Sequence, residues 1–116
     1  MVIVEGIVYM YGGIGSSIYE DIIYYKLDEA VWSKLKFKEL IGFPRYSHCM
    51  MAYENYLVVF GGICKLGKKR GFQNDIRTFD LKTNKWDIWE TNNYAVPPRF
   101  NHAFCIFKSI MFIHGG

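Results

Sequence analysis

The sequence predicts an all-β protein built from a repeated unit of four short strands, and two observations lead to this prediction. The first is repetition, because Pro44-Arg45 returns as Pro98-Arg99 after 54 residues. The second is that the apolar segments are short and rich in β-branched and aromatic residues, and none of ten or more residues has helical periodicity. A period near 50 residues is typical of repeat architectures whose neighbouring units cover one another.

Further landmarks keep the same order along the chain. His48 recurs as His102, and Trp32 recurs as Trp86, each after 54 residues. A Gly-Gly doublet occurs three times, at intervals of 49 and 54 residues, and its members are Gly12, Gly13, Gly61, Gly62, Gly115 and Gly116. The second unit is therefore expected to carry a five-residue insertion, which we place in a loop around residues 64–71.

The first two strands of each unit are predicted to form a hairpin. First strands are expected at residues 48–53 and 102–107, and second strands at residues 7–11, 56–60 and 110–113. The connections between them have hairpin spacing. The second strands are apolar without alternation, which is typical of strands covered on both faces.

The third and fourth strands follow the glycines. Third strands are expected at residues 21–27 and 75–81, and each fourth strand begins near a Trp. Alternation after Trp32 places Lys34, Lys36 and Lys38 on one wet face, as in an outer strand. Apolar inner strands combined with a solvent-exposed outer strand favour a radial arrangement of the sheets, as in the blades of a β-propeller.

These residues together resemble the kelch-repeat family of β-propellers. The shared features are the Gly-Gly doublet that closes the second strand, Asn74-Asp75 before the third, Tyr25 or Phe79 within the third, the Trp of the fourth, and Pro-Arg-x-x-His at the start of the next unit. The resemblance spans essentially the whole chain. It implies a ring of about five to seven blades, within the roughly four to eight of propellers in general, and each blade is a four-stranded antiparallel meander.

Only part of such a ring is expected here. Residues 1–40 are predicted to be a partial blade of second to fourth strands, residues 41–94 a complete blade, and residues 95–116 a partial blade of first and second strands. These nine strands do not close a ring, so closure requires further blades or self-association. We favour a fragment of a longer propeller protein, with a ring of several short chains as the alternative.

Neither a cofactor nor a catalytic residue is expected. The glycines lead from strand to strand, with no helix N-terminus to hold a phosphate. His48 and His102 recur at equivalent positions, which favours packing over catalysis or metal binding, and His114 is expected in the core. Cys49, Cys64 and Cys105 are not repeat-equivalent and lack metal-ligand spacing.

One rim of the predicted propeller collects basic and aromatic residues. Connections in a meander alternate between two rims, so the insertion lies on the same rim as the segments that open each unit. The candidate partner-binding residues on this rim are Lys65, Lys68, Lys69, Arg70, Arg45, Tyr46, Arg99, Phe100 and Asn101. Arginine and aromatic residues are enriched at binding hot spots. A solvated loop that tolerates insertion is the alternative interpretation.

The resemblance implies a non-catalytic protein–protein interaction module that acts as a scaffold or adaptor and binds other proteins, with an acidic partner favoured by the basic insertion. The alternative is part of a galactose-oxidase-like oxidoreductase whose active site lies in missing blades. A net charge of +3 over 116 residues disfavours nucleic acid, and no apolar run approaches the roughly 20 residues of a membrane helix. The odd number of cysteines favours a reducing compartment, so a cytoplasmic location is expected.

Overall fold

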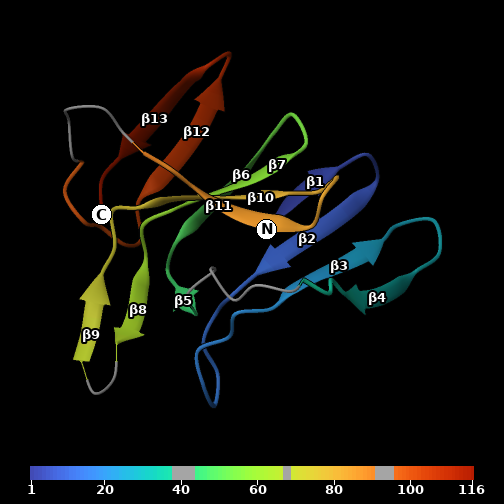
Figure 1. The fold of residues 1–116 in the computed structure, drawn as a ribbon, viewed down its shortest axis with the longest axis horizontal. Coiled ribbons are helices and arrows are strands. Elements are labelled where there is room, and N and C mark those ends of the chain that lie inside the picture. The colour runs from blue at the N-terminus through green and yellow to red at the C-terminus, as the bar shows by residue number, and fades with distance from the viewer. Residues whose placement is uncertain (38–43, 67–68, 91–95) are drawn as a thin grey trace.

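The computed structural model describes residues 1–37, 44–66, 69–90 and 96–116, and its regular secondary structure is entirely β (Figure 1). The all-β prediction is thereby confirmed for the described residues. The described residues form two four-stranded sheets, one two-stranded hairpin and a small three-stranded sheet. Within the described residues, no helix is long and apolar enough to cross a membrane.

The first sheet contains one strand more than predicted. Its order is β1-β2-β3-β4, formed by β1 (Val2–Val4), β2 (Ile7–Tyr11), β3 (Ile22–Lys26) and β4 (Val31–Lys34). The expectation that the first unit begins at its second strand was wrong. Glu5 and Gly6 both have positive φ, at 48° and 76°, which is the geometry of a two-residue hairpin turn. That turn folds the β-branched residues before it back onto β2.

The second unit forms a complete sheet with the expected meander connectivity. Its order is β11-β10-β7-β6, formed by β6 (Cys49–Tyr53), β7 (Tyr56–Phe60), β10 (Ile76–Asp80) and β11 (Lys85–Trp89). The third unit is the hairpin β12 (Ala103–Phe107) and β13 (Ile110–His114). His114 is exposed on the outer face of this hairpin, so its assignment to the core was wrong.

The five-residue insertion is part of a hairpin rather than a loop, which corrects the prediction. Strands β8 (Ile63–Leu66) and β9 (Lys69–Phe72) pair with each other, and β8 also pairs with β5 (Arg45–Tyr46), giving the order β5-β8-β9. In Figure 1 this hairpin projects from the body of the molecule on the same side as the connection between β2 and β3. The apolar pair Ile63 and Phe72 lies directly opposite in register at its base.

Left-handed backbone positions repeat with the same periods as the sequence landmarks. The turns between first and second strands place Glu5, Glu54 and Lys108 at φ of 48°, 51° and 54°. The turns between third and fourth strands place Ala30 and Asn84 in the same left-handed region, at φ of 52° and 55°. These spacings of 49 and 54 residues match those of the Gly-Gly doublets. The repetition is therefore a property of the backbone as well as of the side chains.

Two apolar clusters hold the sheets together. The first lies between the first and second sheets and includes Tyr11, Ile22, Leu57, Phe79 and Trp86. The second lies between the second sheet and the β12–β13 hairpin, and its buried members are Val58, Phe60 and Ile76. Strand β7 supplies both clusters, because its alternate residues face opposite neighbours. This confirms that the second strand of this unit is covered on both faces.

The outer faces of the array stay open in this structure. Trp86 is only 6% exposed inside the first cluster, whereas its repeat partner Trp32 is 56% exposed and contacts Tyr25 at 4.9 Å between ring centroids. At the other end of the array, the exposed face of the β12–β13 hairpin presents Phe107, Ile110 and Phe112. The described units thus leave one apolar sheet face uncovered at each end.

Candidate functional site

The Gly-Gly doublets and the Pro-Arg-x-x-His segments meet where neighbouring units join. The backbone N–H of Gly13 donates to the carbonyl of Arg45 at 2.8 Å, and Gly62 donates in the same way to Arg99 at 2.9 Å. His48 lies against Tyr11 at 5.3 Å between ring centroids, and His102 lies against Phe60 at 5.2 Å. The same junction is therefore built twice, and these landmarks serve packing between units.

Gly61 shows why the junction requires glycine. Its φ is +67°, and a Cβ there would lie 2.6 Å from the carbonyl oxygen of Arg99 and 2.9 Å from the ring of His102. Gly12 repeats this arrangement, because a Cβ there would collide with the carbonyl oxygen of Arg45. The backbone of the next unit thus occupies the space that a side chain would fill. This geometry supports a structural role for the doublets.

Arg45 was expected on the partner-binding rim, and the structure corrects this. Its side chain is fully buried, and its guanidinium donates two parallel hydrogen bonds to the carboxylate of Asp75, at 2.8 and 2.9 Å. Arg77 donates to the same carboxylate at 2.6 Å. Burial raises the pKa of Asp75, but the hydrogen bonds and charges of the two arginines outweigh it and hold the pKa below its usual value. Arg45 therefore stabilises the junction and is not accessible to a partner.

The partly buried histidine of the first junction, His48, is held in its neutral form. Burial, and next the positive charge of Arg45, lower the pKa of His48 to about 4. Burial also lowers the pKa of His102, with a smaller contribution from Arg99. Burial raises the pKa of the Tyr11 phenol, which is part of the same junction. At neutral pH both histidines are uncharged ring-packing residues.

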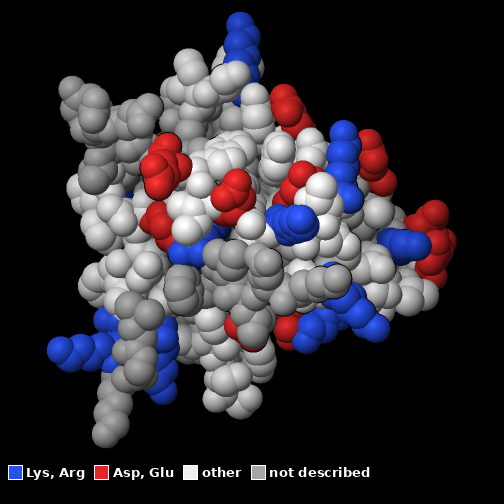
Figure 2. Space-filling model, in the orientation of Figure 1, with Lys and Arg blue, Asp and Glu red and all other residues white. Residues whose placement is uncertain are grey.

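The basic residues of the insertion that the structure describes are exposed. Lys65 lies on β8, and Lys69 and Arg70 lie on β9, whereas Lys68 lies outside the described residues. Figure 2 shows a cluster of positive charge at the end of the hairpin. Lys65 and Arg70 are direct cross-strand partners on one face, and Lys69 pairs with Leu66 on the other. The hairpin thus carries cations on both of its faces.

Most of the other predicted rim residues lie close to the base of this hairpin. Tyr46 pairs with Ile63 in the small sheet, and the backbone N–H of Arg99 donates to the carbonyl of Gln73 at 3.2 Å, just beyond β9. The guanidinium of Arg99 donates to the carbonyl of Gly115 at 2.8 Å, and Asn101 is exposed. The structure therefore brings these residues together on one rim.

Phe100 has a partner that the sequence did not predict. Its ring stacks on Phe72 of β9, with 5.1 Å between centroids and 26° between planes. Phe72 is more than half exposed, so the pair contributes an accessible aromatic surface beside Arg70. Phe72 directly follows the predicted insertion, and its spacing of two residues from Arg70 places both on one face of β9. We call the hairpin with Tyr46, Phe100 and Asn101 the hairpin rim.

A groove borders the hairpin rim on the side of the first sheet. Its volume is about 660 Å³, and it is lined by Ile14, Gly15, Ser16, Ser17, Ile18, Pro44, Lys65 and Arg70. The connection between β2 and β3 supplies one wall and the β8–β9 hairpin the other. The described part of the lining therefore combines two cations, two hydroxyls and several apolar side chains.

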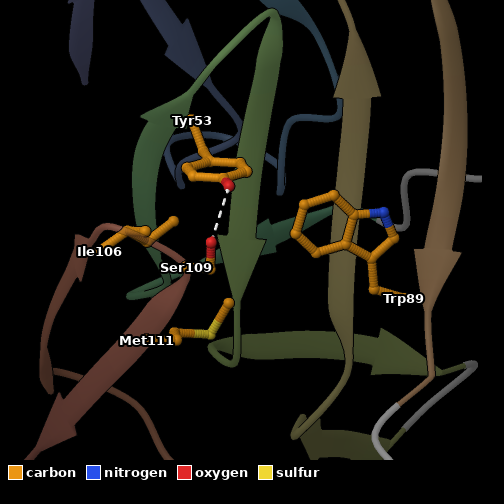
Figure 3. A pocket seen from close by; sticks show the side chains of 5 residues that line it. All are labelled: Tyr53, Trp89, Ile106, Ser109 and Met111. Atoms are coloured by element: carbon orange, nitrogen blue, oxygen red, sulfur yellow. Dashed lines mark hydrogen bonds between the residues drawn. The ribbon is translucent and has the colours of Figure 1, made fainter.

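A smaller cavity lies between the second sheet and the β12–β13 hairpin (Figure 3). Its volume is about 230 Å³, and it is lined by Tyr53, Trp89, Ile106, Ser109 and Met111. The hydroxyls of Tyr53 and Ser109 share a hydrogen bond of 3.4 Å, and the other lining residues are apolar. The cavity continues the second apolar cluster, so we interpret it as an imperfectly filled gap between units.

The described residues contain no group of three or more His, Cys, Asp or Glu side chains able to hold a metal ion. Cys49, Cys64 and Cys105 are all free thiols. The Cys49 thiol donates to the carbonyl of His102 at 2.8 Å, which adds one more contact between the second and third units.

Comparison with known proteins identifies the repeat. The KLHDC2/KLHL20/DRC7 Kelch-repeats domain matches residues 1–116. The chain belongs to the kelch-repeat family. The structure titled "Structure of YjhT" superposes with a TM-score of 0.75 at 22% identity, covering 99% of this kelch chain and 32% of that one. This likeness confirms the predicted propeller fold, and the sheets described above are its blades.

Two relatives place the kelch blades in much longer proteins. The chain is 34% identical over 106 residues to "Negative regulator of sporulation MDS3" of Candida albicans, covering 79% of this chain and 8% of that protein. It is 30% identical over 86 residues to "Leucine-zipper-like transcriptional regulator 1 homolog" of Drosophila melanogaster, covering 73% of this chain and 8% of that protein. The chain thus spans less than a tenth of either relative.

Proposed function

We propose that this kelch domain is a non-catalytic protein-interaction module that binds a partner protein through the hairpin rim. The observation that carries the proposal is the β8–β9 hairpin itself, which projects from the blades and exposes Lys65, Lys69 and Arg70. Both relatives named above are regulators by their titles, which is compatible with a binding role. The domain then acts as a scaffold or adaptor within a larger propeller protein.

The hairpin rim has the composition of a binding hot spot. The stacked Phe72 and Phe100 supply exposed aromatic surface, and Arg70 lies two residues from Phe72 on the same strand. Aromatic and arginine residues contribute a large share of binding energy in protein interfaces. Pairing of β8 with β5 fixes the hairpin before a partner arrives, which lowers the conformational entropy lost on binding.

An acidic partner surface fits this rim best. Among the described residues, Lys65, Lys69 and Arg70 form no ion pair within the chain, so their charges are free to interact with a partner. Opposite charges accelerate association and discriminate among partners. The free thiols fit a reducing compartment, and we place the domain in the cytoplasm.

Ring closure is part of the same proposal. The open apolar faces at the two ends of the array fit further blades, supplied either by a longer chain or by self-association. Light scattering after size-exclusion chromatography of the 116-residue chain distinguishes the two. A discrete oligomer supports self-association, whereas a monomer or a polydisperse aggregate supports blades from a longer chain.

The binding role is tested by comparing two sets of charge substitutions. The first replaces Lys65, Lys69 and Arg70 with Ala, and the second replaces the same number of exposed charges elsewhere, at Lys36, Lys82 and Lys85. Proteins cross-linked to each variant in cells are then quantified by mass spectrometry. We expect a set of partners that the first variant loses and the second retains. Equal partner sets for both variants would contradict the proposal.

A further inference from the structure

The geometry points to the groove between the 14–18 connection and the β8–β9 hairpin as a binding site for an extended acidic segment of a partner protein. This inference rests on the proposed function and gives it a specific ligand class. The groove measures about 660 Å³, within the roughly 300–1,000 Å³ range of ligand sites. Its two walls come from corresponding connections of neighbouring blades, each between a second and a third strand.

The hairpin wall carries two like charges in an arrangement that favours an anion. Lys65 and Arg70 lie directly opposite in the β8–β9 register, and both line the groove. Like charges directly opposite in a sheet are destabilising, and within the described residues no carboxylate is paired with either side chain. An anionic group placed between them would convert repulsion into two charge-assisted hydrogen bonds.

The opposite wall is held in shape by its own backbone contacts. Ile14 and Ile18 form an isolated antiparallel bridge, and the N–H of Gly15 donates to the carbonyl of Ser17 at 2.9 Å. The N–H of Tyr19 also donates to the carbonyl of Gly13 at 2.9 Å. These contacts fix the wall in advance, so little ordering is required when a ligand enters.

The mixed lining selects a peptide in preference to an isolated anion. Ser16 and Ser17 offer exposed hydroxyls for backbone or side-chain hydrogen bonds, and Ile14, more than half exposed, offers apolar contact. None of the described residues that line the groove is acidic. A chain that presents acidic side chains on one face and apolar side chains on the other matches this lining, and alternation in an extended strand provides that arrangement.

The hairpin also supplies a matched control. Lys69 is adjacent to Arg70 but pairs with Leu66 on the opposite face, and it does not line the groove. Removing Lys69 changes the net charge of the hairpin by one unit without altering the groove. A Lys69 variant therefore separates recognition in the groove from general attraction to a basic hairpin.

The test uses fluorescence anisotropy with a labelled decapeptide of alternating Glu and Val. We expect the peptide to bind the 116-residue protein, the double variant Lys65→Ala/Arg70→Ala to bind it at least tenfold more weakly, and Lys69→Ala to change affinity by less than about threefold. The corresponding Gln-Val peptide should bind at least tenfold more weakly than the Glu-Val peptide. Ser17→Trp, which narrows the groove without changing charge, should weaken binding as well.

Several outcomes would overturn this inference. They are absence of binding by the Glu-Val peptide, an equal loss with Lys69→Ala, equal affinity for the Gln-Val peptide, or displacement of the peptide at equal concentration by inorganic phosphate or a thymidine decanucleotide. A phosphoserine-containing version of the peptide that binds at least as tightly supports an anionic peptide ligand. Since Lys65 and Arg70 are exposed and repel each other, the double variant should keep the thermal midpoint of the parent protein, which excludes unfolding as the cause.

The two proposals fail in different ways. If the double variant keeps all of its cellular partners while the triple variant with Lys69 loses them, the groove inference is wrong and the hairpin rim still binds a partner. If the variant with Lys65, Lys69 and Arg70 all replaced by Ala loses none of its cellular partners, the proposed function is wrong. Peptide affinity measured on the purified chain remains an independent measure of the groove.

Discussion

Arg45 and Asp75 form a bidentate ion pair between two segments that lie 30 residues apart, with hydrogen bonds of 2.8 and 2.9 Å. The same guanidinium donates to the carbonyl of Gly61 at 3.0 Å, and Arg77 shares the carboxylate of Asp75. The carboxylate of Asp75 thus compensates the positive charges of two buried arginines at the junction of the first and second blades.

Asp75→Ala should be strongly destabilising, because it leaves both buried arginines without their shared carboxylate. We expect a loss of about 3–5 kcal/mol in the free energy of unfolding, measured by urea denaturation. Asp21 is the matched control, since it is the repeat equivalent of Asp75 but pairs with Lys34 at the surface. Asp21→Ala should cost less than about 1 kcal/mol. Similar losses for both variants would contradict the structural role of the Asp75 cluster.

Gly61→Ala should destabilise the protein more than Gly13→Ala. Both positions have positive φ, at 67° and 107°, so both substitutions introduce backbone strain. Only at Gly61 would the new Cβ lie 2.6 Å from a backbone oxygen of the next blade, whereas nothing lies within 4 Å at Gly13. Thermal melts of the two variants measure the difference. A lower midpoint for the Gly13 variant would show that strain, and not contact between blades, determines the cost.

Stability should fall as the pH is lowered from about 6.5 to about 4. The pKa of His48 is about 4 in the folded protein and about 6.5 in the unfolded chain, so between these values the unfolded chain binds an additional proton. Protonation then draws the equilibrium toward the unfolded state. Thermal midpoints at pH 7, 6, 5 and 4 measure the effect.

His48→Phe provides the comparison for this pH dependence. Phe retains an aromatic ring against Tyr11 but cannot bind a proton. The variant should lose less stability than the parent protein across the same pH interval. The pH dependence that remains is expected to come from His102, whose pKa is also lowered. An unchanged pH dependence in the variant would exclude His48 as its main source.

The three cysteines should react with iodoacetamide in the order Cys105, Cys49, Cys64. Cys105 is exposed on β12, whereas Cys64 is 1% exposed and burial raises the pKa of its thiol. Cys49 is intermediate in exposure, and burial also raises the pKa of its thiol. Because the thiolate is the reactive form, both effects slow alkylation. Time-resolved peptide mass spectrometry gives the order, and alkylation of Cys64 as fast as that of Cys105 would contradict the β5-β8-β9 sheet.

The repeat could be predicted from sequence because its landmarks have obligatory geometry. Glycine recurs at Gly12 and Gly61 since the backbone of the next blade leaves no room for a side chain there. Strand β1 was missed because it has only three residues and precedes every landmark. The turn residue Glu5, 49 residues before Glu54, was the signal that could have revealed it.

The contents of the candidate site were harder to predict because they depend on contacts distant in sequence. Arg45 follows a proline in a segment predicted to connect two blades, which is typical of exposure, but its carboxylate partner comes 30 residues later. Gly67, Gly71 and the charges between them indicated a loop, whereas the structure pairs Ile63 with Phe72 and Lys65 with Arg70 across a hairpin. The Phe72–Phe100 stack joins two blades and has no local sequence pattern.

The pairing of β8 with β5 determines which part of the fold bears a mechanical force applied to the hairpin. A force applied to the tip is transmitted along β8 to Arg45, which pairs with β8. The carbonyl of Arg45 accepts a hydrogen bond from the N–H of Gly13 in the preceding blade, and its guanidinium forms an ion pair with Asp75. A partner that exerts force on the hairpin therefore loads the junction between the first and second blades directly. The projecting hairpin is thus anchored at a junction that contains a buried bidentate ion pair.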